Sequence, residues 1–416
     1  MDKEILKQII TEIDSRKDEI IEFALNLVRE LSETPPGDEA RVANVIKKQA
    51  DLWNLPKPEI WSAKDNRPNL IFAFKGNKKG KVLILNGHID TKPIGDVSKW
   101  KAIDPYNPAI LGDKLYGRGS ADMKGAVAAI IGAVMAIKNC KVPFNGEIVL
   151  ALTADEEGGS TYGAKVLIDK DIKGDGMIIA EPSGAERDFD QLGIACKGAV
   201  LGKIIVHGTQ MHSSLSDKEG CINASVKMAK VMIEFAENLK KNLHYNPHPL
   251  YPNGPTVNPG VILEGGIFYG VIPGIASFGF DLRIIPGMTL KTVKKDIEDF
   301  LVSLMGKDKD LHAELELEKV INNWAPAVEI DRHHPLVLSC MEATENIIGQ
   351  KPKLVGAPFG TDGVFFVKAG IDIQIIPSFG PGFIKLAHGP DEYINLKSII
   401  DAAKIYALVS INYLNS

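Results

Sequence analysis

The sequence predicts an α/β protein that is interrupted by an inserted α+β domain. Three apolar runs read as buried strands, and each leads directly into polar residues. The middle of the chain instead reads strand, helix, strand, strand, helix, strand, which is the order of a ferredoxin-like unit. We therefore expect residues 1–196 and 319–416 to form one domain, with residues 197–318 inserted as a second.

The N-terminal segment, residues 5–31, has apolar residues that recur near the helical period. Its polar positions mix Lys and Arg with Asp and Glu, whereas a helix that lies on a membrane surface has a basic polar face. We therefore expect a helical segment that packs on the core and ends before Pro35, Pro36 and Gly37.

The first predicted strand, residues 81–87, is followed by His88 and Asp90. A spacing of two puts both side chains on one face of an extended chain. His88 can then bind a metal while Asp90 holds its other ring nitrogen. A lone His-x-Asp pair is more often a surface pair than a site, so this motif needs partners.

A glycine-rich loop at residues 116–125 precedes a helix of small residues at 126–138, and it places Asp122 at the helix entrance. The loop lacks the Gly-x-Gly-x-x-Gly and Gly-Lys-Ser/Thr patterns, so it does not indicate a dinucleotide or phosphate site.

The next two predicted strands, residues 147–153 and 176–180, lead into Glu156, Glu157 and Glu181. Adjacent glutamates alone are most often a solvated acidic turn. Open α/β sheets, however, bind their ligands at the carboxyl ends of the strands, and these glutamates all follow strand ends.

Side chains that favour metals therefore recur at the ends of apolar runs. The candidate ligand set is His88, Asp122, Glu157, Glu181 and His388. Mixed imidazole and carboxylate ligands suit zinc or a similar first-row ion better than magnesium or calcium. Two such ions about 3.5 Å apart need a bridging carboxylate, and they lower the pKa of a water between them. The set thus predicts a two-metal hydrolase, with Glu156 as a spare carboxylate.

The inserted domain is predicted element by element. Its strands are expected at 199–207, 256–263, 277–285 and 311–318, and its helices at 221–240 and 290–304. The first domain is then expected to resume with a helix at 335–348, a loop at 360–363, a strand at 371–376 and His388. His388 is thus separated from the other candidate ligands by the inserted domain, so only folding of the chain can bring them together.

Composition favours an enzyme of two or more domains in the cytoplasm. The 416 residues are 45% hydrophobic and 24% charged, which allows a large core. The net charge of −5 argues against general nucleic-acid binding. The N-terminus has no apolar signal segment, and we expect no run of membrane-spanning length and no membrane partner.

Several motifs resemble those of a known family, the co-catalytic zinc peptidases and deacylases that include acetylornithine deacetylase, succinyl-diaminopimelate desuccinylase and glutamate carboxypeptidase. The similarity runs from about residue 80 to the C-terminus. It is carried by residues 87–90, 117–125, 155–158, 181–183 and 387–392.

The resemblance implies a zinc-peptidase-like domain with a central mixed sheet flanked by helices, which binds two zinc ions, with cobalt or manganese as substitutes. One ion would be held by His88, Asp122 and Glu181, and the other by Asp122, Glu157 and His388. Glu156 would be the general base and Asp90 the residue that orients His88. The family often has a cis peptide after the bridging aspartate, so the Asp122–Met123 bond is a candidate for one.

In the same family the inserted domain forms the dimer interface and a lid. His212 matches the histidine that reaches a neighbouring active site and helps to stabilise the oxyanion, although the proline that often follows it is missing here. The alternative is an ordinary histidine on a surface loop.

Arg283 resembles the family position that clamps the substrate carboxylate, which suits a planar guanidinium. The alternative is an arginine on a strand face, paired with Asp281 or another acid. Asn258, Gly380 and Gly382 resemble further substrate contacts.

Together these features predict a cytoplasmic, homodimeric two-zinc amidohydrolase that uses metal-activated water. Its substrate would be an N-acyl amino acid or the C-terminal bond of a short peptide. Two alternatives stay open. A two-zinc aminopeptidase would need an acidic anchor for a free amine, and a non-catalytic binding protein on this fold should have lost Glu156, which is present.

Overall fold

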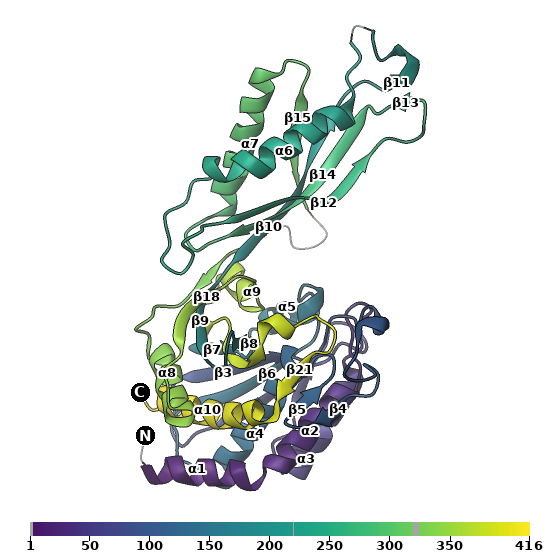
Figure 1. Cartoon of the computed structure of the whole chain (residues 1–416). Coiled ribbons are helices and arrows are strands. Elements are labelled where there is room, and N and C mark those ends of the chain that lie inside the picture. Colours follow the sequence, from purple (N-terminus) through teal and green to yellow (C-terminus); the bar gives the residue numbers. More distant parts are fainter. Residues whose placement is uncertain (1–2, 219, 319–323) are drawn as a thin grey trace. The chain divides into compact units, whose positions relative to one another are not determined.

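The protein is described here from a computed structural model, which covers residues 3–218, 220–318 and 324–416 (Figure 1). The chain divides into two compact units. The first unit comprises Met1–Cys196, Val328–Ala357 and Thr361–Ser416, and the second comprises Lys197–Ala327 with Pro358–Gly360.

A six-stranded sheet forms the centre of the first unit, in the order β1-β2-β6-β3-β7-β19. Strands β6, β3, β7 and β19 run parallel to one another. At one edge β2 pairs antiparallel with β6, and β1 pairs antiparallel with β2. This mixed sheet confirms the predicted α/β fold. The strands are β1 (Glu59–Trp61), β2 (Asn69–Lys75), β3 (Val82–His88), β6 (Glu147–Thr153), β7 (Gly176–Ile179) and β19 (Gln374–Ile376).

Smaller sheets extend this unit. They have the orders β17-β9-β18, β20-β8 and β21-β5-β4. Their strands are β4 (Ala109–Leu111), β5 (Lys114–Tyr116), β8 (Pro182–Gly184), β9 (Gln191–Cys196), β17 (Val328–Glu329), β18 (Lys353–Ala357), β20 (Gly380–Phe383) and β21 (Tyr393–Asn395).

Helices surround the sheet in Figure 1, and α4 packs against α1, α2 and α10. The helices are α1 (Lys3–Ser15), α2 (Lys17–Arg29), α3 (Ala40–Leu52), α4 (Gly125–Asn139), α5 (Ala164–Asp169), α8 (Pro335–Ile348), α9 (Gly363–Lys368) and α10 (Leu396–Leu414). The bounds of α8 coincide with the predicted helix, whereas β19 is shorter than the predicted strand at 371–376.

One long apolar stretch of the first unit is buried inside the protein. Among the described residues, Ser120–Asn139 has the length and apolar composition of a membrane span, although no such run was expected. Every residue of its apolar window is buried inside the protein. The small side chains of α4 allow this close packing, so α4 serves as the central core helix of the unit.

The N-terminal helical segment is broken at Arg16, although its hydrophobic pattern indicates no break. Arg16 has non-helical dihedral angles and separates α1 from α2. Its guanidinium pairs with Glu12 at 3.2 Å and Glu19 at 3.0 Å, which are on either side of the break. The apolar faces of both helices are buried, including Ile13 and Ile20.

The second unit contains an antiparallel sheet in the order β12-β14-β10-β15, covered by two helices that contact each other. The element order β10-α6-β12-β14-α7-β15 is the predicted one. The elements are β10 (Gly198–His207), α6 (Ala224–Asn242), β12 (Thr256–Gly265), β14 (Ile275–Ile284), α7 (Leu290–Lys307) and β15 (His312–Leu317).

The far boundary of the second unit lies beyond the predicted one. Residues 319–323, next to the expected boundary at 318, are outside the described residues. Strand β16 (Trp324–Ala325) then pairs with β10, so the unit continues to Ala327. A lone two-residue strand gives too short a pattern for sequence analysis to detect.

A buried ion network holds three segments of the first unit together. The Arg67 guanidinium pairs with Glu39 at 2.7 Å and with Asp155 at 2.8 Å, and it also donates to Thr34. The side chains of Arg67 and Glu39 are only 3% and 0% exposed. Asp155 directly precedes Glu156, so the network supports the loop that carries this glutamate.

Removing Arg67 should therefore be costly. Arg67→Ala leaves buried carboxylates without a counter-charge, and we expect a loss of about 3–5 kcal/mol in the free energy of unfolding. Arg16→Ala removes an arginine with half-exposed ion pairs and should cost about 1 kcal/mol or less. Denaturant unfolding of both variants measures the difference, and equal small losses would show that the network is not stabilising.

Candidate metal centre

Three of the five predicted ligands, His88, Glu157 and Glu181, lie at the carboxyl ends of parallel strands. His88 ends β3, and Glu181 follows β7. Glu156 and Glu157 begin a short 3₁₀ turn, Glu156–Gly158, after β6. These strands are hydrogen-bonded neighbours in the sheet, so their ends bring the side chains to one edge.

Asp122 and His388 complete the group from two other loops. Asp122 lies in the turn Ser120–Lys124 before α4, and the Asp122–Met123 peptide is cis, which confirms the expectation from the family resemblance. His388 follows the 3₁₀ turn Ile384–Leu386. All of the predicted ligands lie in the first unit.

The Asp122 carboxylate lies between the two histidines. Its Oδ1 is 3.1 Å from Nε2 of His88, and its Oδ2 is 3.2 Å from Nε2 of His388. Glu181 is 3.7 Å from the same nitrogen of His88, and Glu157 is 3.0 Å from that of His388. Each histidine thus has its own glutamate, and both share the aspartate.

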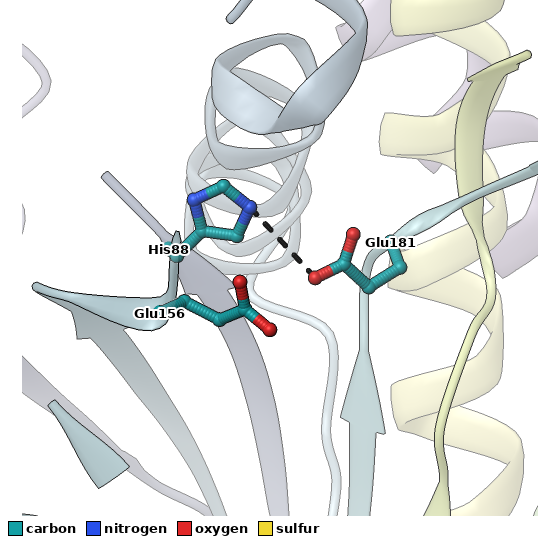
Figure 2. A group of neighbouring side chains, drawn as sticks. All are labelled: His88, Glu156 and Glu181. Atoms are coloured by element: carbon teal, nitrogen blue, oxygen red, sulfur yellow. Dashed lines mark ion pairs between the residues drawn. The ribbon is translucent and has the colours of Figure 1, made fainter. Parts of the chain in front are cut away.

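Glu156 lies beside the same cluster. Ligand-type atoms of His88, Glu156 and Glu181 all lie within 4.8 Å of one another, and so do those of His88, Asp122 and Glu157. Figure 2 shows His88 and Glu181 as an ion pair, with the carboxylate of Glu156 next to them. The sequence analysis expected Glu156 as a spare carboxylate beside the ligand Glu157.

The electrostatics of this cluster favour a cation. Burial raises the pKa of Glu156 and of Glu181 well above the usual value. Burial acts in the same direction on Asp122, but hydrogen bonds from His388 and His88 outweigh it and hold the pKa of Asp122 far below its usual range. Carboxylates gathered in a buried site need positive charge, which divalent ions supply.

The carboxylates around the two histidines favour the protonated form of each imidazole. Burial lowers the pKa of His88, but hydrogen bonds to Asp122 and Asp90 raise it well above the usual value. Hydrogen bonds to Asp122 and Glu157 raise the pKa of His388 to about 10. A metal ion binds neutral imidazole, so metal binding here releases protons.

Asp90 contacts His88 differently from the prediction. Nδ1 of His88 donates to the main-chain carbonyl of Asp90 at 2.9 Å, whereas the carboxylate is 3.5 Å away. This contact leaves Nε2 as the nitrogen that faces Asp122 and Glu181. The Asp90 carboxylate instead accepts hydrogen bonds from the main-chain N–H groups of Glu156 and Glu157, at 3.1 and 3.2 Å.

Two further residues shape the same loop and were not singled out in the sequence. Asp362 is buried and accepts hydrogen bonds from Thr153, at 3.0 Å, and from Ser160. Thr153 and Ser160 flank the loop that carries Glu156. Burial raises the pKa of Asp362 to about 6. Lys92 forms an ion pair with Glu157 at 3.3 Å.

The two predicted glycines have a structural role next to the ligands. A Cβ atom at Gly380 would meet the carbonyl oxygen of Ala180 at 2.0 Å. Gly382 has a φ of +92°, and a Cβ there would meet Ala121 at 3.2 Å. Both glycines therefore let β20 approach the loops that carry Glu181 and Asp122.

The remaining predicted site residues belong to the second unit. His212 is exposed and accepts a hydrogen bond from the N–H of Ser214. Arg283 pairs with Asp281 through two contacts, at 2.7 and 2.8 Å, as in the alternative given above. Asn258 donates to the carbonyl of Asp281 at 3.2 Å.

Comparison with known proteins assigns the chain to a family. A model of peptidase family M20/M25/M40 matches residues 84–412. The chain is 30% identical over 335 residues to a succinyl-diaminopimelate desuccinylase of Sulfurovum sp. (strain NBC37-1), which covers 79% of this chain and 83% of the relative. It is 26% identical over 433 residues to N-formyl-4-amino-5-aminomethyl-2-methylpyrimidine deformylase of Bacillus subtilis (strain 168), covering 97% and 96% of the two chains.

A solved structure shows the same fold. It is a dinuclear metal-binding peptidase of the M20 family from Bacillus subtilis, with a TM-score of 0.71, 14% identity, and coverage of 96% of this chain and 99% of that one. The family model spans most of the chain and includes every predicted metal ligand. The chain therefore belongs to peptidase family M20/M25/M40 and is a metal-dependent hydrolase.

Proposed function

We propose that the first unit binds two zinc ions that share Asp122. Site A consists of His88, Asp122 and Glu181, and site B of Asp122, Glu157 and His388. The observation that carries the proposal is the position of Asp122, whose two oxygens face different histidines at 3.1 and 3.2 Å. A ligand set of imidazole and carboxylate groups favours zinc, and cobalt or manganese are possible substitutes.

We propose that Glu156 is the general base. When bound, the two ions polarise a carbonyl and lower the pKa of a water molecule. Glu156 accepts a proton from the attacking water and passes it to the leaving nitrogen, so that the amide C–N bond breaks into a carboxylate and an amine. Hydrogen bonding of the Glu156 N–H to Asp90 holds this residue in place.

The proposed substrates are N-acyl amino acids, with the C-terminal bond of short peptides as the second candidate. One relative is named a succinyl-diaminopimelate desuccinylase, which supports the first class, and another is named as the deformylase of an N-formyl pyrimidine. A screen of the zinc-loaded protein against N-acetyl, N-succinyl and N-formyl amino acids and blocked or free dipeptides tests it. Preference for peptides with a free N-terminus would favour an aminopeptidase, and no turnover at all would favour a binding protein.

We further propose a cytoplasmic homodimer that forms through residues 197–318, with no nucleic-acid or membrane partner. Strand β12 is at the edge of its sheet, and Phe268, which follows this strand in the sequence, is 78% exposed. Exposed apolar residues of this kind mark association surfaces. They are Val261, Ile262, Leu263, Ile267, Phe268 and Tyr269. His212 of one copy would then stabilise the oxyanion in the other copy.

Replacement of Glu156 tests the general base. Glu156→Gln keeps the side-chain volume and all five proposed ligands, so about two zinc ions per chain should remain bound. We expect kcat to fall by roughly 10²–10⁴-fold, as is typical when a general base is lost. Metal analysis and steady-state kinetics check both points, and near-normal turnover would remove Glu156 from the mechanism.

Replacement of Asp122 tests the shared ligand. Asp122→Ala should weaken the binding of both zinc ions, because each site loses an oxygen ligand. His388→Ala should weaken only one ion by roughly 10–100-fold or more, since it belongs to site B alone. Zinc titration distinguishes the two variants, and two tightly bound ions in Asp122→Ala would contradict the sharing of this carboxylate.

Replacement of Arg283 tests recognition of the substrate carboxylate. Arg283→Lys keeps the charge but loses the planar fork, so kcat/KM should fall much more for free-acid substrates than for their amides. Asp281→Asn is the matched control, because it removes the negative charge of the observed partner of Arg283 and keeps the guanidinium. Equal losses on acids and amides would make Arg283 a structural residue.

Mixed dimers test the role of His212. Homodimers of His212→Ala and of Glu156→Gln should each be nearly inactive. In a mixed dimer one site combines the intact Glu156 of one chain with the intact His212 of the other. Random exchange of equal amounts makes about half of the dimers mixed, so about a quarter of wild-type activity should return.

The exchange itself must be verified, for example with mass-tagged chains. If exchange is complete and no activity returns, His212 does not act across a dimer.

A further inference from the structure

We propose that the buried ion pair between Arg118 and Glu392 is a positioning pair that aligns Asp122 with His388 and thereby sets the affinity of site B. The inference rests on the proposed function, because site B is part of it. Arg118 Nη1 is 2.7 Å from Glu392 Oε2, and their side chains are 3% and 0% exposed.

Glu392 holds the loop that carries the shared aspartate. Its Oε1 accepts hydrogen bonds from the main-chain N–H groups of Ala121, at 2.9 Å, and Asp122, at 3.1 Å. Its main-chain carbonyl accepts a further hydrogen bond from Gly117 at 2.9 Å. These contacts fix the main chain of Asp122 without using its carboxylate oxygens, which stay directed at the histidines.

Arg118 connects the same pair to His388. Its Nη2 donates to the main-chain carbonyl of His388 at 3.0 Å, while Nη1 contacts Glu392. A planar guanidinium can donate to a carboxylate and a carbonyl at once, whereas a lysine ammonium lacks this fixed fork. One arginine therefore ties together segments that are 270 residues apart in the sequence.

His388 needs such an anchor more than the other ligands do. Its side chain is 49% exposed, whereas those of Asp122 and Glu157 are 7% and 5% exposed. Its main chain has a φ of +62°, a left-handed conformation that residues other than glycine adopt at a cost. The carbonyl of this residue is the group that Arg118 binds, so the pair stabilises the conformation that presents the ring.

The same loop contains a matched control. The Asp391 side chain accepts hydrogen bonds at 2.8 Å from the main-chain N–H groups of Lys101 and Ala102. These two contacts involve neither Arg118 nor a metal ligand. Its φ is +54°, a conformation that asparagine tolerates well. Asp391→Asn therefore changes the charge of the loop while Arg118 and Glu392 remain in place.

The test is zinc and cobalt titration of the full chain, with unfolding measured on the metal-free protein. Arg118→Lys should bind one ion as the wild type does and the second roughly 10–100-fold more weakly, as for other residues that orient ligands. The visible absorption of the weaker cobalt site should change as well. Asp391→Asn should keep both affinities and the spectrum. Glu392→Gln breaks the ion pair but keeps an oxygen that can accept from the N–H groups of Ala121 and Asp122, so it should also weaken the second ion only.

A double-mutant cycle assigns the weakened site. In a His388→Ala background site B is already lost, so adding Arg118→Lys should not change the affinity of the remaining ion. A further loss there, or unchanged binding of both ions in Arg118→Lys, would overturn the inference. If the wild type itself binds fewer than two ions, the proposed two-metal function fails instead.

Discussion

The sharing of one carboxylate between two histidines is the constraint on which the rest of the first unit depends. Asp122 can face both His88 and His388 only if loops from distant parts of the sequence meet at one edge of the sheet. Parallel strands deliver His88, Glu157 and Glu181 to that edge, and the C-terminal loop delivers His388. The buried helix α4 fixes the turn that carries Asp122.

Gathering carboxylates at this edge requires compensation even before a metal binds. Hydrogen-bond donors supply part of it, since Asp90 accepts from two main-chain N–H groups and Glu392 accepts from two others. Arg67 and Arg118 supply buried positive charge beside the ligands rather than among them. The framework thus leaves the centre itself to be neutralised by cations.

Much of this arrangement could be predicted from the sequence. Three of the ligands follow apolar strands, and the order of elements in the second unit follows from hydrophobic periodicities that span whole helices and strands. The resemblance to a family supplied the pairing of ligands into two sites, and the family itself is confirmed. Short features such as strand β16 and the break at Arg16 were not predicted, because they are too short to produce a hydrophobic periodicity in the sequence.

The supporting residues were harder to predict for a physical reason. Asp362 and Glu392 act through hydrogen bonds to segments far away in the sequence, so only the folded chain shows their partners. Asp90 was singled out, but its carbonyl, not its carboxylate, makes the short contact to His88. Substrate preference is similarly hidden, because it depends on pocket residues that the metal-binding motifs do not include.

A crystal structure of the zinc-loaded protein, with anomalous maps at the zinc edge, tests the central claim most directly. The account predicts two zinc peaks about 3.5–4 Å apart, with one oxygen of Asp122 bound to each ion. A single zinc peak, or two ions that are not both bound by Asp122, would contradict it.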